Sequence, residues 1–290
     1  MTSDLFFPPR SFAGLPPELT ALDTARAVVL PVPYDSTTDY KSGARDGPRA
    51  IIDSSQYLEF YDLELGQEVS SVGIHTLPEL QPAMSGPEAT VERVYRAARG
   101  IFERGKLLVM LGGEHSLTLG AVKAAKERYP NLGVLQLDAH ADLRDTYMAT
   151  EYSHACVMRR VWELCPIVQV GIRSLSLEEH RFLEEQGVEP LYAPLPEADV
   201  TEKVVSALPD EVYISVDLDV FDPSIMAAVG TPEPGGLGWE QALHLLKAAA
   251  STRHIVGLDL MELCPREGPT SCAFLAAKLA YKLIGYALLL

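Results

Sequence analysis

The stretch "LQLDAHADLRD" occupies residues 135–145 of this chain. It joins an apolar run, typical of a buried strand, to three ionisable residues at every second position, Asp138, His140 and Asp142. In an extended segment these side chains share one face, because side chains alternate along a strand. Neighbouring buried carboxylates repel each other, so we expect a positive group among them.

Similar apolar runs recur along the chain and alternate with helical patterns. Strands are expected at residues 27–31, 107–111, 133–138, 167–171, 212–219 and 255–260, and helices include residues 116–130 and 239–251. Strands that are apolar on both faces and separated by helices predict a parallel sheet covered on both sides. No linker, repeat or change of composition divides the sequence, so we expect one α/β domain over residues 1–290.

The composition limits the classes of partner. The formal net charge of −16 argues against nucleic acid, which selects basic surfaces, and favours the approach of a cationic small molecule. Four cysteines without a CxxC pair fit reduced thiols in a cytoplasm. The N-terminus lacks the features of a signal peptide. In the apolar C-terminal stretch, Lys278 and Lys282 lie four residues apart, which favours a helix packed on protein over a membrane span. We therefore expect a cytoplasmic chain with no membrane partner.

Several expected strands are followed by groups that bind metals, and in open parallel sheets ligands bind beyond the carboxyl ends of the strands. The candidate ligands are His115, Asp138, His140, Asp142, Asp217 and Asp219. Four aspartates in one cleft would not all stay ionised without cations, and two divalent ions would balance them. This oxygen-and-imidazole set without thiolate suits Mn²⁺ and also accepts Fe²⁺, Co²⁺, Ni²⁺ or Zn²⁺. Asp138 and Asp217 are candidates to bridge ions about 3.5–4 Å apart.

Two further polar residues and one loop accompany these motifs. His154 lies in "EYSHACVMRR", a polar segment expected to open a helix, where a histidine often only caps the helix or faces solvent. Glu262 follows the strand at 255–260, where an exposed glutamate is common. The loop "GTPEPGG" at 230–236 lacks the GK[ST] ending of a phosphate-binding loop. Its Pro and Gly residues predict a rigid loop that lines a pocket.

Taken together, "GGEHS", "LDAHADLRD", "SVDLDVFDPS", "GTPEPGG" and "GLDLMELCP" resemble, in order and spacing, the motifs of the ureohydrolases, the family of arginases and agmatinases. The segment "VPYDSTTDYKSGARDGPRAI" also looks like the opening of that family. The resemblance extends from Val28 to the C-terminal helix and implies a three-layer α/β/α fold with a mostly parallel sheet. It also implies two Mn²⁺ per subunit, a homo-oligomer (trimer or hexamer) and hydrolysis of a guanidino group to urea and an amine.

The resemblance assigns roles to the site residues. One ion is expected at His115, Asp138, Asp142 and Asp217, and the other at Asp138, His140, Asp217 and Asp219. Two dications lower the pKa of water between them, which gives a nucleophile at near-neutral pH. The expected catalytic residues are Asp142, which passes a proton to the leaving nitrogen, His154 as proton shuttle and Glu262 as the carboxylate that holds guanidinium.

Agmatine is the expected substrate, giving urea and putrescine in polyamine biosynthesis. Arginases have a Ser-Gly-Asn segment just before the histidine matched by His154, whereas this chain has "MATEYSH", which disfavours L-arginine. "DLRD", "SHACVMRR" and "GTPEPGG" look more like the agmatinase branch. A smaller departure is Glu114, which stands where many relatives have Asp.

Three alternatives stay open. The same reaction on aminopropylagmatine, guanidinobutyrate or L-arginine is compatible with the motifs, because the pocket loops select the tail. A metal-dependent amide deacetylase would use a related fold with one catalytic metal, which the paired Asp217 and Asp219 argue against. A non-catalytic binding homologue would be expected to have lost at least one ligand, and all six are present.

Overall fold

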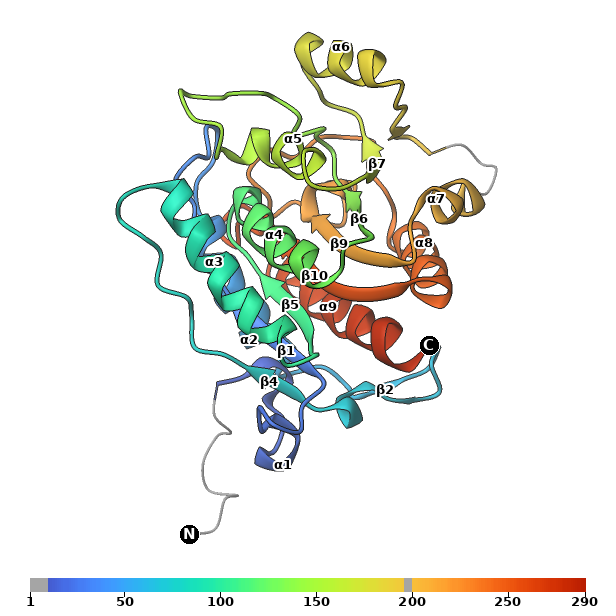
Figure 1. Cartoon of the computed structure of the whole chain (residues 1–290). Coiled ribbons are helices and arrows are strands. Elements are labelled where there is room, and N and C mark those ends of the chain that lie inside the picture. The colour runs from blue at the N-terminus through green and yellow to red at the C-terminus, as the bar shows by residue number, and fades with distance from the viewer. Residues whose placement is uncertain (1–9, 196–199) are drawn as a thin grey trace.

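An eight-stranded sheet forms the centre of the computed structural model, which describes residues 10–195 and 200–290 (Figure 1). Its strand order is β4-β1-β5-β10-β9-β6-β7-β8, and every pairing in it is parallel. The strands are β1 (Ala27–Pro31), β4 (Ile74–Thr76), β5 (Leu107–Leu111), β6 (Leu132–Leu137), β7 (Ile167–Ile172), β8 (Leu191–Tyr192), β9 (Glu211–Asp217) and β10 (His254–Met261). A separate antiparallel pair joins β2 (Tyr61–Asp62) to β3 (Gln67–Glu68). Residues 1–9, part of the stretch in which no signal peptide is expected, lie outside the described residues.

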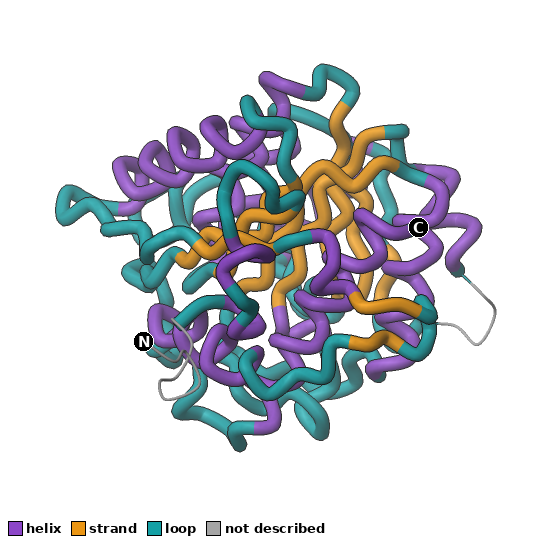
Figure 2. Tube along the Cα trace, turned by 90° about the horizontal axis from the view of Figure 1, so that it is seen from below, coloured by secondary structure: helices purple, strands orange, loops and turns teal. Residues whose placement is uncertain are grey.

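Helices cover both faces of the sheet. They are α1 (Pro17–Thr20), α2 (Gly47–Ser55), α3 (Pro87–Phe102), α4 (Thr118–Arg128), α5 (Val157–Trp162), α6 (Leu177–Gln186), α7 (Thr201–Ala207), α8 (Trp239–Thr252) and α9 (Ser271–Leu289). On one side of the sheet α4 contacts α3 and α5. On the other side α9 contacts α2 and α8, and α8 contacts α7. Figure 2 shows the strands enclosed between these helices. The predicted three-layer α/β/α arrangement is confirmed.

Burial on both faces explains why the strands are apolar throughout. In β1, Ala27 and Val29 pack into one apolar cluster, whereas Val28 and Leu30 pack into the cluster on the opposite face. All five residues of β1 are buried. A strand of this kind shows a continuous apolar run instead of a polar–apolar alternation.

The strand predicted over 212–219 ends earlier than expected. Its last residue is Asp217, after which the chain turns into the 3₁₀ helix η7 (Leu218–Val220). The Asp217 carboxylate accepts a hydrogen bond from the backbone N–H of Asp219 at 3.0 Å. This local bond accompanies the turn, so Asp219 lies outside the strand that was predicted to extend to residue 219.

The same effect changes the segment after β6. The Asp138 carboxylate accepts a hydrogen bond from the backbone N–H of His140 at 2.6 Å, and Asp142 has a φ of 54°. The chain therefore leaves the extended conformation directly after β6, and the predicted common face of an extended segment is wrong. A turn, rather than the pleat of a strand, brings these side chains together.

The C-terminal helix α9 is long and apolar enough to cross a membrane, but 67% of its most apolar window is buried inside the protein. It packs against α2, α8 and β10. Lys282 is buried within it and forms ion pairs with Asp62 at 3.1 Å and Glu64 at 2.5 Å. This is the packing of a helix that contributes to a protein core, as the sequence predicts.

Gly113 makes a close approach of two loops possible. A Cβ atom at this position would lie 1.8 Å from the backbone oxygen of Tyr34, which also accepts the hydrogen bond of the Glu114 N–H. We expect Gly113→Ala to lower the free energy of unfolding by about 1–3 kcal/mol, because the backbone must move. The matched control Gly100→Ala lies in α3 with no atom within 4 Å of the added Cβ and is expected to raise it by about 0.5–1 kcal/mol. Urea denaturation measures both, and equal effects would contradict this account.

Candidate active site

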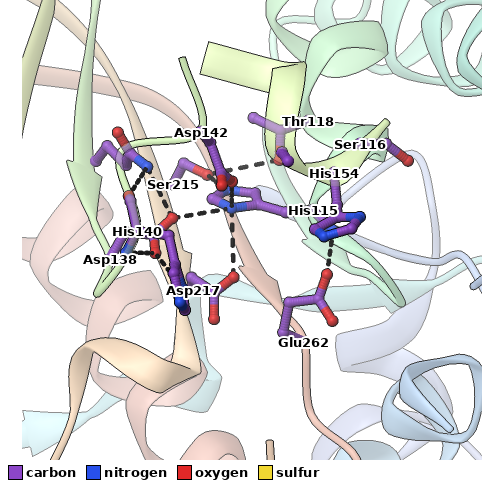
Figure 3. A network of polar contacts seen from close by, with 12 residues as sticks. His115, Ser116, Thr118, Asp138, His140, Asp142, His154, Ser215, Asp217 and Glu262 are labelled. Atoms are coloured by element: carbon purple, nitrogen blue, oxygen red, sulfur yellow. Dashed lines mark hydrogen bonds and ion pairs between the residues drawn. The ribbon is translucent and has the colours of Figure 1, made fainter. Parts of the chain in front are cut away.

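Four adjacent strands, β5, β10, β9 and β6, bring the candidate residues to one edge of the sheet. His115 opens the 3₁₀ helix η5 (His115–Leu117) after β5, Asp138 follows β6, Asp217 ends β9 and Glu262 follows β10. These side chains converge because the carboxyl ends of parallel strands lie at the same edge. A cavity of about 250 Å³ opens there, and it is lined by His115, His140, Asp142, His154, Asp217, Asp219 and Glu262. Figure 3 shows this convergence.

Three carboxylates surround one nitrogen of His115. Its Nδ1 lies 3.1 Å from an oxygen of Asp138, 3.1 Å from one of Asp142 and 3.3 Å from one of Asp217. The Nδ1 atom is buried and makes no hydrogen bond of good geometry with the described residues. Carboxylate oxygens that converge on an unsatisfied imidazole nitrogen fit a divalent cation, which would take all four atoms as ligands.

A second group of ligand atoms lies beside the first. His140 Nδ1 is 2.9 Å from Asp219 Oδ2 and 3.8 Å from Asp138 Oδ1. The ligand atoms of these three residues lie within 4.8 Å of one another, as do those of His115, Asp138 and Asp142. Asp138 therefore belongs to both groups, which supports its predicted bridging position. Asp217 contacts His115 in the first group, and its predicted contact with a second ion stays a prediction.

Burial and mutual charge shift the pKa values of these groups strongly. Burial, together with the charges of Asp219 and Asp142, raises the pKa of Asp138 to about 7. Burial alone would lower the pKa of His140, but the charge and hydrogen bond of Asp219 outweigh it and raise the pKa to about 11. Burial and the charge of Asp219 also raise the pKa of Asp217. The raised pKa values mean that this cluster favours positive charge, which protons or bound cations can supply.

Mn²⁺ binding to this site is expected to release protons. Below about pH 7 the proton on Asp138 competes with the cation, and this competition weakens as the pH rises through 7. His140, whose pKa is about 11, must also lose a proton throughout this range. The apparent dissociation constant should therefore fall by about tenfold or more per pH unit between pH 6 and pH 8. Calorimetric titration in buffers of different ionisation enthalpy measures the proton release. Asp145→Asn, at an exposed position three residues after Asp142, serves as the control. A pH-independent affinity would contradict the assignment.

A buried hydrogen-bond chain fixes the orientation of His115. Ser215 Oγ donates to Asp259 Oδ1 at 2.7 Å and lies 2.8 Å from His115 Nε2. Asp259 is completely buried and also accepts hydrogen bonds from Tyr213 and Thr118. Because the hydroxyl proton of Ser215 points to the carboxylate, His115 Nε2–H donates to Ser215, and Nδ1 is left for a cation.

The sequence reasoning missed this chain of contacts, although a signal was present. Tyr213 and Ser215 alternate with Asp217 along β9, and Asp259 interrupts the apolar run of β10. Polar residues at every second position of a buried strand need partners on the same face. Those partners here support a proposed metal ligand.

Arg173 is a second residue that the sequence reasoning missed. Its guanidinium donates to the backbone oxygens of Asp219 at 2.7 Å and Glu233 at 2.8 Å. It therefore ties the turn that carries Asp219 to the 230–236 loop. Gly230 and Thr231 of that loop line the cavity, as predicted for a rigid Pro/Gly loop.

Glu262 is positioned by backbone geometry and by His115. It follows β10 with a φ of 65°, and its Oε1 accepts the backbone N–H of His115 at 2.7 Å. Burial and the charge of Glu114 raise its pKa well above the ordinary value. Within the described part of the chain, no cationic side chain pairs with Glu262, so a buried carboxylate in the cavity is left for a cationic ligand.

His154 also lines the cavity. It opens the 3₁₀ helix η6 (His154–Cys156) that leads into α5, which agrees with the predicted helix start. The ring of Tyr147 stands edge-on to the ring of His154 with centroids 5.9 Å apart. The Tyr147 hydroxyl donates to the exposed carboxylate of Asp39, which also lines the cavity. The site residues thus meet in one cavity that has an acidic group at its rim.

Comparison with known proteins places these features in a family. The sequence profile described as the arginase family matches residues 25–285. An N(1)-aminopropylagmatine ureohydrolase of Synechocystis sp. is 40% identical over 280 residues, which is 92% of this chain and 91% of that protein. An agmatinase of Pyrococcus horikoshii is 35% identical over 277 residues, covering 92% and 95%. The crystal structure of agmatine ureohydrolase of Thermoplasma volcanium has a TM-score of 0.88 at 31% identity and covers 98% of this chain and 96% of that one.

Proposed function

Because the chain belongs to the arginase family and is a ureohydrolase of that family, we propose that it hydrolyses the guanidino group of an aminoalkylguanidine to urea and an amine, with two Mn²⁺ bound. The observation that carries the proposal is one cavity in which two groups of ligand atoms share Asp138 and in which Glu262 and His154 also lie. A binding homologue would need neither both ligand groups nor the two further residues.

The donor set fits two divalent cations. The residues proposed to hold them are His115, Asp138, His140, Asp142, Asp217 and Asp219. When bound, the two cations would lower the pKa of water, so that a nucleophile forms at near-neutral pH. Carboxylate and imidazole ligands without thiolate suit Mn²⁺.

The protein side chains orient the substrate and move protons. The carboxylate of Glu262 pairs with the guanidinium and fixes the direction from which its carbon is attacked. Asp142 accepts a proton from the attacking water, and His154 exchanges protons with the leaving nitrogen. The carbon–nitrogen bond to the alkyl tail breaks, and both water protons end on the departing amine. The products are urea and an alkylammonium ion.

Relatives point to a long cationic tail. The relatives of 40–41% identity are named for N(1)-aminopropylagmatine, whereas the agmatinases are 35% and 30% identical. Asp39 offers a carboxylate at the cavity rim for a tail ammonium, and the net charge of −16 favours a polycation. We therefore place N(1)-aminopropylagmatine first as substrate and agmatine, the substrate expected from the sequence, second.

Urea release by the Mn²⁺-loaded protein tests the proposal. N(1)-aminopropylagmatine, agmatine, guanidinobutyrate and L-arginine are supplied at matched concentration, and kcat/KM is compared. The highest value for N(1)-aminopropylagmatine supports the proposal. A preference for agmatine would show that agmatine is the substrate and that the longer tail is not required. No urea from any of the four, with two metals bound per chain, overturns it. Metal analysis that finds one ion per chain would favour the amide deacetylase.

We also propose that the protein is a homo-oligomer and is located in the cytoplasm. The trimer or hexamer implied by the resemblance would be measured by light scattering after size-exclusion chromatography. The cytoplasmic location would be measured by cell fractionation.

A further inference from the structure

Glu114 is the centre of a buried hydrogen-bond cluster. Its Oε2 accepts the backbone N–H groups of Ser36 at 2.5 Å and Thr37 at 2.6 Å. Its Oε1 accepts the hydroxyls of Thr37 at 2.9 Å and Ser116 at 2.5 Å. Glu114 is fully buried and Thr37 nearly so. The carboxylate therefore fixes the loop at Thr37 against the segment that begins with His115.

Thr37 in turn contacts both the backbone and the ring of His154. Its Oγ1 accepts the backbone N–H of His154 at 3.0 Å and lies 3.2 Å from the ring Nδ1. A threonine hydroxyl has one proton, and here the carboxylate of Glu114, which only accepts, takes it. Oγ1 can then serve His154 only as an acceptor, so the proton of the ring belongs on Nδ1.

We propose that Thr37, oriented by Glu114, is a positioning residue that holds His154 with Nδ1 protonated and with Nε2 as the nitrogen that exchanges protons in the cavity. The proposal rests on the proposed function for the role of His154, but the orientation itself does not depend on the substrate. A fixed tautomer matters because a shuttle that presents a proton on the wrong nitrogen must first rotate or exchange with solvent.

Other neighbours of the ring hold it less specifically. Ser153 Oγ is 3.5 Å from His154 Nδ1, at the limit of a hydrogen bond, and already accepts the backbone N–H of Ala155 at 3.2 Å. Tyr147 meets the ring only edge-on through its own ring. Among the described residues, Thr37 therefore makes the shorter of the two hydrogen-bond contacts to Nδ1.

Kinetics of three variants test the proposal. Thr37→Val keeps the shape of the side chain and removes the hydroxyl, and it is expected to lower kcat by about 10- to 100-fold with KM changed by less than about threefold. Thr37→Ser restores the hydroxyl and should recover kcat to within about threefold of the wild type. Ser36→Ala, one residue away, keeps its backbone contact with Glu114 and serves as the matched control. Equal kcat in Thr37→Val and the wild type would overturn the proposal.

The ¹⁵N chemical shifts of the imidazole test the orientation without turnover. The full chain is loaded with diamagnetic Zn²⁺, and the His154 signals are assigned by their loss in His154→Gln. At a pH where the ring is neutral, the wild type and Thr37→Ser should show a protonated Nδ1 and an unprotonated Nε2. Thr37→Val should show a mixture of tautomers. A wild-type proton on Nε2 would overturn the proposal, even if urea release is normal.

The two experiments separate the failure of this proposal from the failure of the proposed function. If no guanidino compound yields urea, the function fails, while the tautomer of His154 is still measured. If urea is released but Thr37→Val keeps both the wild-type kcat and the wild-type tautomer, only the positioning role of Thr37 fails.

Discussion

Asp138→Asn is expected to lower kcat/KM by about 1000-fold or more and to remove bound metal from the protein, because Asp138 is the residue that both ligand groups share. An amide keeps the size of the side chain but has no charge and only one oxygen to accept with. His115 and His140 would both lose a carboxylate partner. Metal analysis by mass spectrometry and urea release together measure the effect.

Unfolding is not expected to cause this loss. The folded pKa of Asp138, about 7, lies above its ordinary value of 3.8, so its contribution to stability is fully present below about pH 4 and is lost as the pH rises through 7. At pH 8 the ionised carboxylate opposes folding in the metal-free protein. Metal-free Asp138→Asn should therefore unfold at or above the wild-type temperature at pH 8. Asp145→Asn, at an exposed position of the same motif, is the control and should keep metal and activity. Full metal content in Asp138→Asn would contradict the assignment of Asp138 as a ligand in both groups.

Glu262→Gln is expected to lower kcat/KM by about 100- to 1000-fold while the protein keeps its metal, because Glu262 belongs to neither ligand group. The substitution leaves an oxygen that can accept the backbone N–H of His115 but removes the charge that we propose pairs with the guanidinium. A buried cation without its partner loses much of its binding free energy. Steady-state kinetics and metal analysis separate this result from that of Asp138→Asn.

The matched control for Glu262 is Glu267→Gln. Glu267 lies five residues further along and forms a partly exposed ion pair with Lys41 at 3.2 Å. Its loss should change kcat/KM by less than about threefold, since exposed ion pairs contribute little. Loss of metal from Glu262→Gln would show that Glu262 acts on the cations instead of the guanidinium.

The sheet was predictable because its strands are buried on both faces. β1 and β5 have the bounds expected from their apolar runs, and β6 ends one residue before the expected end. The ends of β6 and β9 were not predictable from alternation, because Asp138 and Asp217 bond to the backbone two residues ahead and start turns. Residue spacing alone does not reveal which way a side chain bonds.

The candidate site was predictable to the extent that its residues follow strand ends. The convergence of His115, Asp138 and Asp217 follows from a parallel sheet once the strands are known. The support around them was not predictable, because it joins segments that are far apart along the chain. Thr37 lies 77 residues from Glu114 and 117 from His154, and nothing in either local motif indicates the contact.

The position of β10 has a consequence for a shortened chain. It is the last strand to be synthesised, yet it lies in the middle of the sheet, between β5 and β9. His115 and Asp217, which lie 3.3 Å apart at their nearest atoms, belong to the two strand ends on either side of it. A chain that lacks β10 has a gap between these strands. A chain truncated before β10 should therefore be unable to retain the proposed cations, which metal analysis of the purified fragment measures.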